Sequence, residues 1–297
     1  MPEQSRAWIL EQFPGANSIS YVRRLYGGAT SSIHAVNVLT KDITHRLVLK
    51  RPLPTDSWWR LAVRNEGAAL KVAAGAGLAA PEFVARTARG APALLMTRLA
   101  GRVHLAPHSS RWLEKLAETL VQIHSVAASR ARGVWKYQAR PSTDEFAVPS
   151  WADDRRPWLR LFRLRRSEPP QHDSVFCHGD YHPGNVLWRG ASISGVVDWQ
   201  FAVAGSPGLD VAHCRSNLAL LEGVDAAEDF LEIYRSTSGR RLEGQQWFDA
   251  RDALIFSPEP SDVWDWQGFG RPDLKRSLLR RRLSQYVSSI VPTGRQT

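Results

Sequence analysis

Two short segments hold the side chains best suited to chemistry. They are residues 178–185, with the sequence HGDYHPGN, and residues 196–199, with the sequence VVDW. Both segments are typical of loops between short apolar strands, where catalytic groups are often displayed. The predicted hairpin between them can bring Asp198 back beside Asn185, which would supply the hard oxygen ligands that Mg²⁺ prefers. Asp180 could then orient an acceptor hydroxyl and take its proton.

The pattern His178-x-Asp180-x4-Asn185, followed by Asp198, resembles the loops of kinase-like enzymes, in the form found in the aminoglycoside phosphotransferase and choline kinase family. The resemblance implies that Asp180 is the catalytic base and that His178 shapes the same catalytic loop. It also implies that Asn185 and Asp198 hold magnesium. Protein kinases usually carry Arg where Gly179 stands, so the departure favours enzymes that phosphorylate small molecules.

The first hundred residues are similar to the nucleotide-binding part of the same family. The resemblance implies that Lys50 contacts the α- and β-phosphates of ATP and that Glu66, on the following helix, holds Lys50 in place. It also implies that the backbone near Thr97 and Leu99 binds adenine, with GTP left open as the nucleotide. A turn of small residues would lie over the phosphates, where backbone N–H groups can approach oxygen closely. This turn consists of Gly27, Gly28, Ala29, Thr30, Ser31 and Ser32.

Without the resemblance, the same loop leaves other chemistry open. His178 and His182 are four residues apart and could bind zinc from one face of a helix. The Pro-Gly pair at residues 183–184 argues against a helix there. Asp180 and Asp198 could also be the paired carboxylates of a hydrolase, but that reading leaves the lysine and the order of the motifs unexplained.

The elements that must position these residues fall into two groups. Apolar periodicity predicts a β-rich part and then a mainly helical part that contains a short β-hairpin. We therefore expect an α+β, bilobal, protein-kinase-like fold, with a nucleotide-binding lobe over residues 1–98 and a catalytic and substrate-binding lobe over residues 99–297. Strands are predicted over 19–26, 33–40, 45–50, 93–99, 174–177, 186–188 and 193–198. Helices are predicted over 64–74, 111–127, 155–166, 225–236, 244–256 and 273–290.

Charge is the unusual feature of the composition. The chain of 297 residues has a formal net charge of +10, which would suit a nucleic acid or a membrane surface. Residues 171–270, however, contain 6 basic and 15 acidic side chains, a net charge of −9 around the predicted catalytic loop. A local anionic field favours a cationic acceptor, such as an aminoglycoside or another amino-bearing antibiotic. Four residues that could contact such a substrate are Asp262, Trp264, Asp265 and Trp266.

Alternatives to this function remain open. A metabolite kinase acting on a choline-like, sugar or amino-alcohol substrate shares every motif, and so does a kinase-like binding protein that has lost catalysis. No nucleic-acid-binding motif is recognised, so a nucleic-acid partner is not favoured. There is no run of 18 apolar residues and no pattern of a secretory signal, and only two cysteines occur. We therefore expect a cytoplasmic monomer or dimer without a membrane partner.

Overall fold

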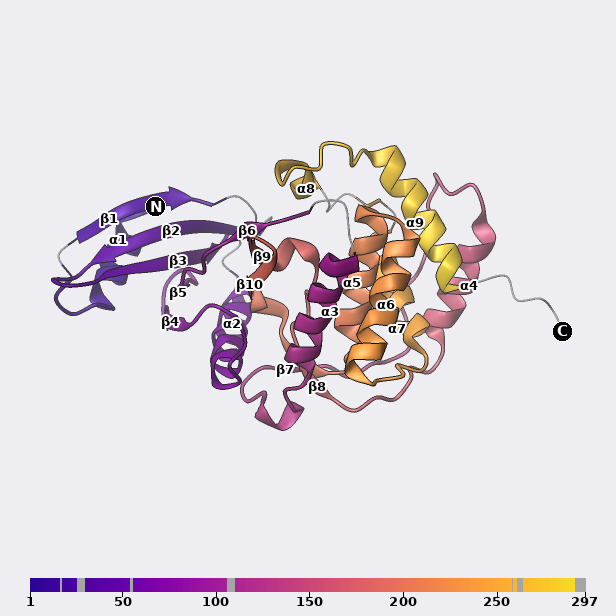
Figure 1. Cartoon of the computed structure of the whole chain (residues 1–297), viewed down its shortest axis with the longest axis horizontal. Helices are drawn as coiled ribbons and strands as arrows, with labels where there is room; N and C mark the ends of the chain where they lie inside the picture. The colour runs from indigo at the N-terminus through magenta and orange to yellow at the C-terminus, as the bar shows by residue number, and fades with distance from the viewer. Residues whose placement is uncertain are drawn as a thin grey trace.

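The computed structural model describes residues 1–16, 18–25, 30–53, 56–105, 110–257, 259–260 and 264–291. The molecule is elongated, with a sheet at one end and a body of packed helices at the other (Figure 1). The described part of the chain contains no helix that combines the length and the hydrophobicity needed to cross a membrane. The α+β arrangement matches the predicted fold class.

A five-stranded antiparallel sheet forms the N-terminal end, in the strand order β1-β2-β3-β5-β4. Alternating apolar residues of its central strands are buried, and helix α1 (Glu3–Glu11) covers one side through Ile9. Four of the strands overlap the predicted ones. The short strand β4 was not predicted because it lies at a sheet edge and buries little. The strands are β1 (Ser18–Arg24), β2 (Ser31–Leu39), β3 (Thr44–Pro52), β4 (Phe83–Arg86) and β5 (Leu94–Thr97).

Helix α2 (Ser57–Gly75) links this sheet to the rest of the molecule. It begins seven residues before the predicted helix because the Asp56 side chain accepts hydrogen bonds from the backbone N–H groups of Trp58 and Trp59, which caps the N-terminus. Its apolar side chains enter the same buried cluster as those of the C-terminal helices. The predicted lobe boundary follows residue 98, just after β5. Buried residues on both sides of this boundary pack in one hydrophobic cluster.

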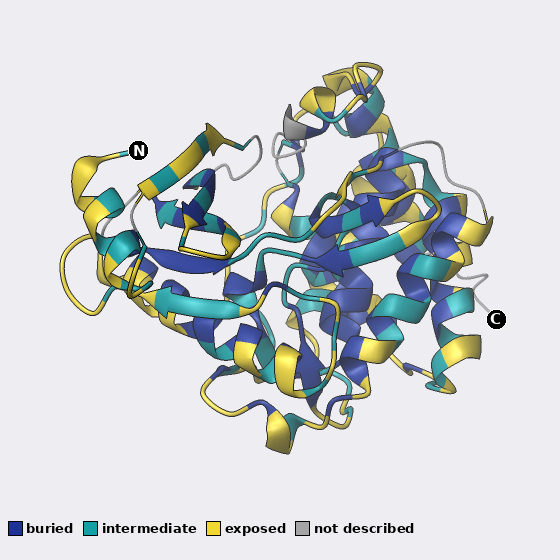
Figure 2. Ribbon diagram, turned by 60° about the vertical axis from the view of Figure 1, so that its left-hand side comes forward, coloured by how far each residue is buried: buried dark blue, intermediate teal, exposed yellow. Residues whose placement is uncertain are grey.

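The C-terminal part is a group of helices whose packed faces are buried, as Figure 2 shows. Helix α5 was not predicted, because nearly all of its residues are buried and its sequence therefore lacks a polar side to reveal the helical period. The predicted helices are all present. The helices are α3 (Ser110–His124), α4 (Arg155–Arg166), α5 (Gly208–Leu221), α6 (Val224–Ser238), α7 (Gln245–Ile255), α8 (Trp264–Gly268) and α9 (Arg276–Ile290).

Two small sheets, in the orders β10-β9-β6 and β7-β11-β8, hold the loops that carry the chemistry. The catalytic loop lies between β8 and β9, and the Asp198 loop lies between β10 and β11, so both loops leave short, paired strands. The predicted hairpin is therefore present. The strands are β6 (Arg102–Val103), β7 (Trp135–Lys136), β8 (Val175–Cys177), β9 (Val186–Arg189), β10 (Ser192–Val196) and β11 (Val203–Gly205).

Candidate active site

Lys50 joins the N-terminal sheet to the C-terminal loops. It lies near the end of β3, and its Nζ donates to Glu66 Oε2 at 2.7 Å and to Asp198 Oδ1 at 2.6 Å. Glu66 comes from α2, the element after β3, whereas the Asp198 loop is far away in sequence, and all three meet at one ammonium group. The predicted pair of Lys50 and Glu66 is present, and Asp198 extends it.

The charges in this cluster depend on one another. Burial disfavours the charged form of Lys50, but the carboxylates of Asp198 and Glu66 outweigh that effect, and the pKa of Lys50 is raised. Burial raises the pKa of Glu66, and the Lys50 ammonium opposes this rise. A lysine held between two carboxylates stays charged at neutral pH, as a phosphate ligand must.

The catalytic loop is fixed by a buried carboxylate from α5. The backbone N–H groups of His178 and Gly179 both donate to the Asp210 carboxylate, each at 2.7 Å, and His124 contacts the same carboxylate at 3.1 Å. Asp210 is fully buried, and these partners keep the pKa of its carboxyl group below the ordinary value even though burial opposes ionisation. Asp210 therefore braces the catalytic loop from α5.

His178 supports the loop through both ring nitrogens. Its Nε2 lies 3.0 Å from the Val197 carbonyl oxygen, and the Asp180 backbone N–H donates to its Nδ1 at 3.3 Å. A carbonyl can only accept and an N–H can only donate, so these contacts require a neutral ring with hydrogen on Nε2. Burial lowers the pKa of His178, which agrees with that form. His178 thus connects the two functional loops as a shaping residue.

Asn185 and Asp180 face each other across the loop. The Asn185 amide donates to Asp180 Oδ2 at 3.0 Å and to the Asp180 carbonyl at 2.9 Å, which leaves Asn185 Oδ1 free to act as a ligand. Val197 N donates to the Asn185 carbonyl at 2.9 Å and so holds Asp198 beside it. One amide oxygen and one carboxylate are a donor set that suits Mg²⁺. The residues present therefore fit the predicted magnesium ligands.

The phosphate turn is only partly described. Ser31 and Ser32 begin β2 and are buried, and the Ser31 Oγ has no hydrogen-bond partner among the residues that the structure describes. A buried hydroxyl without a partner calls for an acceptor, and a phosphate oxygen would supply one. Thr30 is exposed just before them. Residues 27–28 lie outside the described residues, so the predicted contacts of these two glycines stay predictions.

The two residues predicted to bind adenine differ in whether their backbone groups already make hydrogen bonds within the protein. The Thr97 N–H donates to the Glu82 carbonyl at 2.9 Å within the sheet, so it is not free for a base. The Leu99 backbone makes no hydrogen bond with any residue that the structure describes, and its side chain packs on Gly195 of β10. Leu99 is therefore the better candidate for adenine, and Thr97 is better explained by the sheet.

The predicted substrate residues lie around α8, which projects from the helical body (Figure 1). Trp266 is only 4% exposed, and its indole lies beside Gly184 of the catalytic loop, so it offers no open ring face. The backbone of Trp264 and Asp265 is described, but their side chains are not. Asp262 lies outside the described residues. The substrate contacts predicted for these four residues therefore stay predictions.

Sequence reasoning missed His213, which contacts the predicted base, and Asp252, which contacts His213. His213 Nε2 lies 3.0 Å from Asp180 Oδ1, and His213 Nδ1 lies 2.7 Å from Asp252 Oδ1. The expected zinc alternative paired His178 with His182, but here Asp180, His182 and His213 are the residues that converge. The turn at Pro183–Asn185 is a short 3₁₀ helix, which excludes the α-helical zinc geometry. No local pattern marks His213 or Asp252, because each comes from a different helix.

The acidic segment is largely paired within the protein. Arg215 binds both Asp249 and Glu228, and Arg271 binds Glu222. Arg280 binds Glu259 in the same way. Several acidic groups of residues 171–270 are therefore paired with arginine, histidine or lysine side chains. The anionic field that the composition predicts for the acceptor side is correspondingly weaker in the folded molecule.

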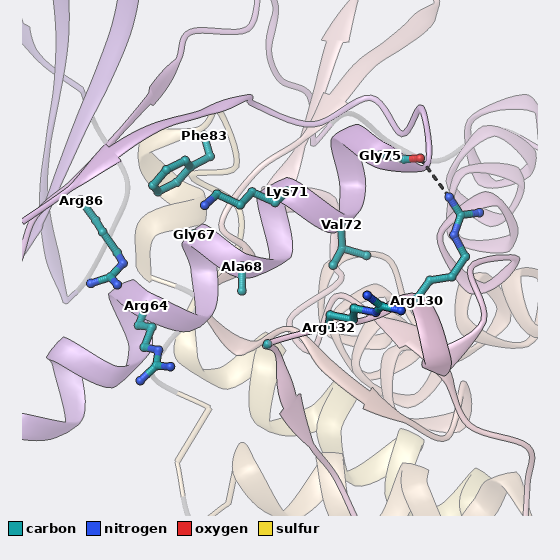
Figure 3. A pocket seen from close by; sticks show the side chains of 11 residues that line it. Arg64, Gly67, Ala68, Lys71, Val72, Gly75, Phe83, Arg86, Arg130 and Arg132 are labelled. Carbon is teal, nitrogen blue, oxygen red and sulfur yellow. Dashed lines mark hydrogen bonds between the residues drawn. The ribbon is translucent and has the colours of Figure 1, made fainter. Parts of the chain in front are cut away.

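A cavity of about 470 Å³ lies away from these loops, on the face of α2 that carries Arg64, Lys71 and Val72 (Figure 3). It is bounded by α2, by Phe83 of β4 and by the segment that follows α3. Its charged lining residues are all basic, namely Arg64, Lys71, Arg86, Arg130 and Arg132. Because α2 separates the cavity from Lys50 and Asp198, the cavity is not part of the candidate active site. It accounts for part of the positive charge of the N-terminal region.

The family follows from comparison with known proteins. The sequence matches the model of the phosphotransferase enzyme family over residues 23–244, which is most of the chain. The chain therefore belongs to the phosphotransferase enzyme family, which confirms the resemblance drawn from its motifs. No curated protein sequence matches it.

Solved structures confirm the kinase-like phosphotransferase fold. Macrolide 2'-phosphotransferase MphH from Brachybacterium faecium is 17% identical, with 99% of this chain and 100% of that chain covered and a TM-score of 0.61. A thermostable mutant of aminoglycoside phosphotransferase APH(4)-Ia, in ternary complex with AMP-PNP and hygromycin B, is 16% identical, with full coverage of both chains and a TM-score of 0.63. An aminoglycoside-3'-phosphotransferase of type VIII is 18% identical, covering 84% of this chain and 97% of its own, with a TM-score of 0.57.

Proposed function

We propose that this protein transfers the γ-phosphate of ATP to a hydroxyl group of a small molecule. The carrying observation is a single connected network across the two parts of the chain. Lys50 contacts Asp198, the Asp198 loop is bonded to Asn185, and Asn185 bonds Asp180. Phosphoryl transfer depends on positioning and on charge neutralisation, and this network provides both.

The chemistry assigns one step to each residue. The Asp180 carboxylate orients the acceptor hydroxyl and takes its proton as the oxygen bonds to the γ-phosphorus. The bond from the γ-phosphorus to the oxygen that bridges it to the β-phosphorus breaks, which leaves ADP and the phosphorylated acceptor. Lys50 holds the phosphates in place. Magnesium, when bound, neutralises phosphate charge, and Asn185 and Asp198 would hold it.

The acceptor is proposed to be an aminoglycoside-like or other amino-bearing antibiotic. The support is that two neighbouring structures are named as a macrolide phosphotransferase and as an aminoglycoside phosphotransferase bound to hygromycin B. Because acidic side chains of residues 171–270 are paired with basic side chains, we retain a second candidate function. A metabolite kinase for a sugar needs no strong anionic field, so the weakened field is compatible with it. Both cysteines are free, which agrees with the predicted cytoplasmic location.

Replacing Asp180 with Ala tests the reaction class. We expect phosphate transfer to fall at least a hundredfold, by about the contribution of a general base, while binding of an ATP analogue stays within about threefold. Calorimetry with AMP-PNP and magnesium would measure the binding. A variant that still transfers phosphate at the wild-type rate would disprove the assignment of Asp180 as the base.

An acceptor screen identifies the substrate class. ADP formation would be measured with ATP and then with GTP, in the presence of aminoglycosides, macrolides, choline, sugars and amino-alcohols. The antibiotic proposal predicts turnover with at least one antibiotic and protection of a susceptible host that expresses the protein. Turnover confined to the metabolites would replace it with the second candidate.

A further inference from the structure

A row of three polar side chains extends from the predicted base into the helical body. Asp180 Oδ1 lies 3.0 Å from His213 Nε2, and His213 Nδ1 lies 2.7 Å from Asp252 Oδ1. The Asp252 side chain is fully buried, whereas those of His213 and Asp180 are 16% and 24% exposed. The open end of the row is therefore the catalytic carboxylate, and the closed end is a carboxylate that no solvent or substrate can reach.

The contacts determine the protonation of the ring. An ionised carboxylate only accepts hydrogen bonds, so each ring nitrogen of His213 must carry a hydrogen to face one. The Asn217 amide nitrogen also lies 3.3 Å from Nε2, but it donates to the His213 backbone carbonyl at 2.8 Å and so does not need Nε2 as an acceptor. His213 is therefore an imidazolium between two carboxylates. Burial disfavours this charge, but Asp252 and Asp180 outweigh burial and raise the pKa of His213 to about 10. The same contacts lower the pKa of Asp180, so both partners stay ionised at neutral pH.

The packing around the ring fixes its position. His213 is on α5, one turn after Asp210, and so belongs to the helix that braces the catalytic loop. Phe256 stacks on the imidazole with the ring centroids 6.4 Å apart, and the His182 ring meets it edge-on at 5.5 Å. Arg251 also bonds Asp252, at 3.2 Å. The charged and titratable groups that face His213 are thus Asp180, His182 and Asp252, with Arg251 behind Asp252.

We propose that His213 is a positioning residue for phosphate transfer: its Nε2–H holds one oxygen of the Asp180 carboxylate while Asn185 holds the other. This inference rests on the proposed function of Asp180. Two fixed donors leave the carboxylate a single orientation, so its free lone pairs point to one place where an acceptor hydroxyl can bind. Asp252 does not reach the substrate, and it serves by keeping His213 charged and in place.

The test replaces Asp252 with Asn, which keeps the shape and an oxygen acceptor for Nδ1 but removes one negative charge. His213 should then lose one of its two protons at a lower pH, and its Nε2–H bond to Asp180 should change from a charge-assisted to a weaker, neutral hydrogen bond. The matched control is Asp249→Asn, which removes another buried carboxylate of the same helix, one bonded to Arg215 and not to the row. Thermal melting of both variants would report any loss of stability.

Two readouts separate positioning from a structural role. NMR of histidine labelled in the ring should show the His213 titration moving down by more than 1 pH unit in the Asp252 variant, and staying in place in the control. Initial rates would be measured from pH 6 to pH 10 with ATP and the best acceptor from the screen. The alkaline fall in kcat should move toward neutral pH only in the Asp252 variant, while KM for ATP stays within about twofold.

A second variant keeps the inference falsifiable if the first fails to fold. His213→Gln retains one N–H that can reach Asp180, so it should lose about tenfold in kcat, whereas His213→Phe should lose about a hundredfold. Wild-type kcat in both His213 variants, or a pH profile of the Asp252 variant equal to the control, would overturn the role of His213. Full activity of the Asp180→Ala enzyme would instead overturn the proposed function itself, so the two failures are distinguishable.

Discussion

Gly179 shows how one residue position restricts the catalytic loop. Its φ is +82°, in the left-handed region that favours glycine. A Cβ placed there would collide with the backbone carbonyl of Phe201, in the turn that follows Asp198. The two functional loops can therefore approach closely only because this residue has no side chain. That contact explains why the arginine of protein kinases has no place in this loop.

We predict that Gly179→Ala lowers the free energy of unfolding by more than the strain of a left-handed backbone alone would. The matched control is Gly190→Ala, where φ is +61° but nothing lies within 4 Å of an added Cβ. The control should cost about 1–2 kcal/mol of unfolding free energy, the usual penalty for a left-handed residue with a side chain. Gly179→Ala should cost several kcal/mol more and lose binding of AMP-PNP, as measured by urea unfolding and calorimetry. Equal costs for the two variants would contradict this reading of the contact.

The position of Glu66, and with it that of the predicted phosphate ligand Lys50, depends on helix α2. Asn65 is buried next to Glu66, and its amide donates to the carbonyls of Gln200 at 3.0 Å and Ala202 at 2.8 Å. Its Oδ1 accepts from Trp135 N at 2.8 Å. One side chain thus ties α2 to the segment after Asp198 and to β7, and so keeps Glu66 in reach of Lys50.

We predict that Asn65→Ala destabilises the protein by about 3 kcal/mol, because two buried carbonyl groups and one half-buried N–H group lose their partner. The KM for ATP should rise as α2 and Glu66 shift away from Lys50. Arg64→Ala, at an exposed position on the same helix, should change stability by no more than about 0.5 kcal/mol. Chemical denaturation and steady-state kinetics with ATP would measure both effects. If Asn65→Ala behaves like Arg64→Ala, the helix is held by its apolar face alone.

At the scale of the whole molecule, the largest hydrophobic core extends across the predicted boundary between the lobes. The largest buried cluster joins Leu70 of α2 and Met96 of β5 to the C-terminal helices. A smaller cluster around Val36 and Leu47 belongs to the sheet and α1 alone. The outer strand β1 has no fully buried residue. Stability should therefore decline along the sheet with distance from the helical body.

Hydrogen–deuterium exchange tests this gradient. We expect the amides of α2 and β5 to exchange as slowly as those of α5, because they open only when the shared core opens. Amides of β1 should exchange much faster, since this edge strand can separate without exposing the main core. Mass spectrometry of peptides from each element would give the rates. Uniform exchange over the whole N-terminal sheet would show instead that this part unfolds as a unit of its own.

Local patterns in the sequence were sufficient for the family, the fold class and most elements. Residues 178–185 lie in one short loop whose composition indicates its function, and Lys50 and Glu66 occur in strand and helix patterns that the structure confirms. The fold class followed because alternation and helical spacing depend on which side of each element is buried. The sequence did not predict the close packing of the two loops, because a glycine at position 179 does not indicate that it faces the Phe201 carbonyl.

Only the tertiary structure brought His213 and Asp252 to the base. Both come from helices that are distant from the catalytic loop in sequence, and α5 is buried on nearly all sides, so no polar period marks it. Dependence on tertiary packing also limits the argument from net charge. Residues 171–270 carry a net charge of −9, but acidic side chains such as Glu222 and Glu259 meet arginines from outside this segment only after the helices pack. Composition sums charges along a chain, whereas the field at a site depends on which opposite charges folding places beside them.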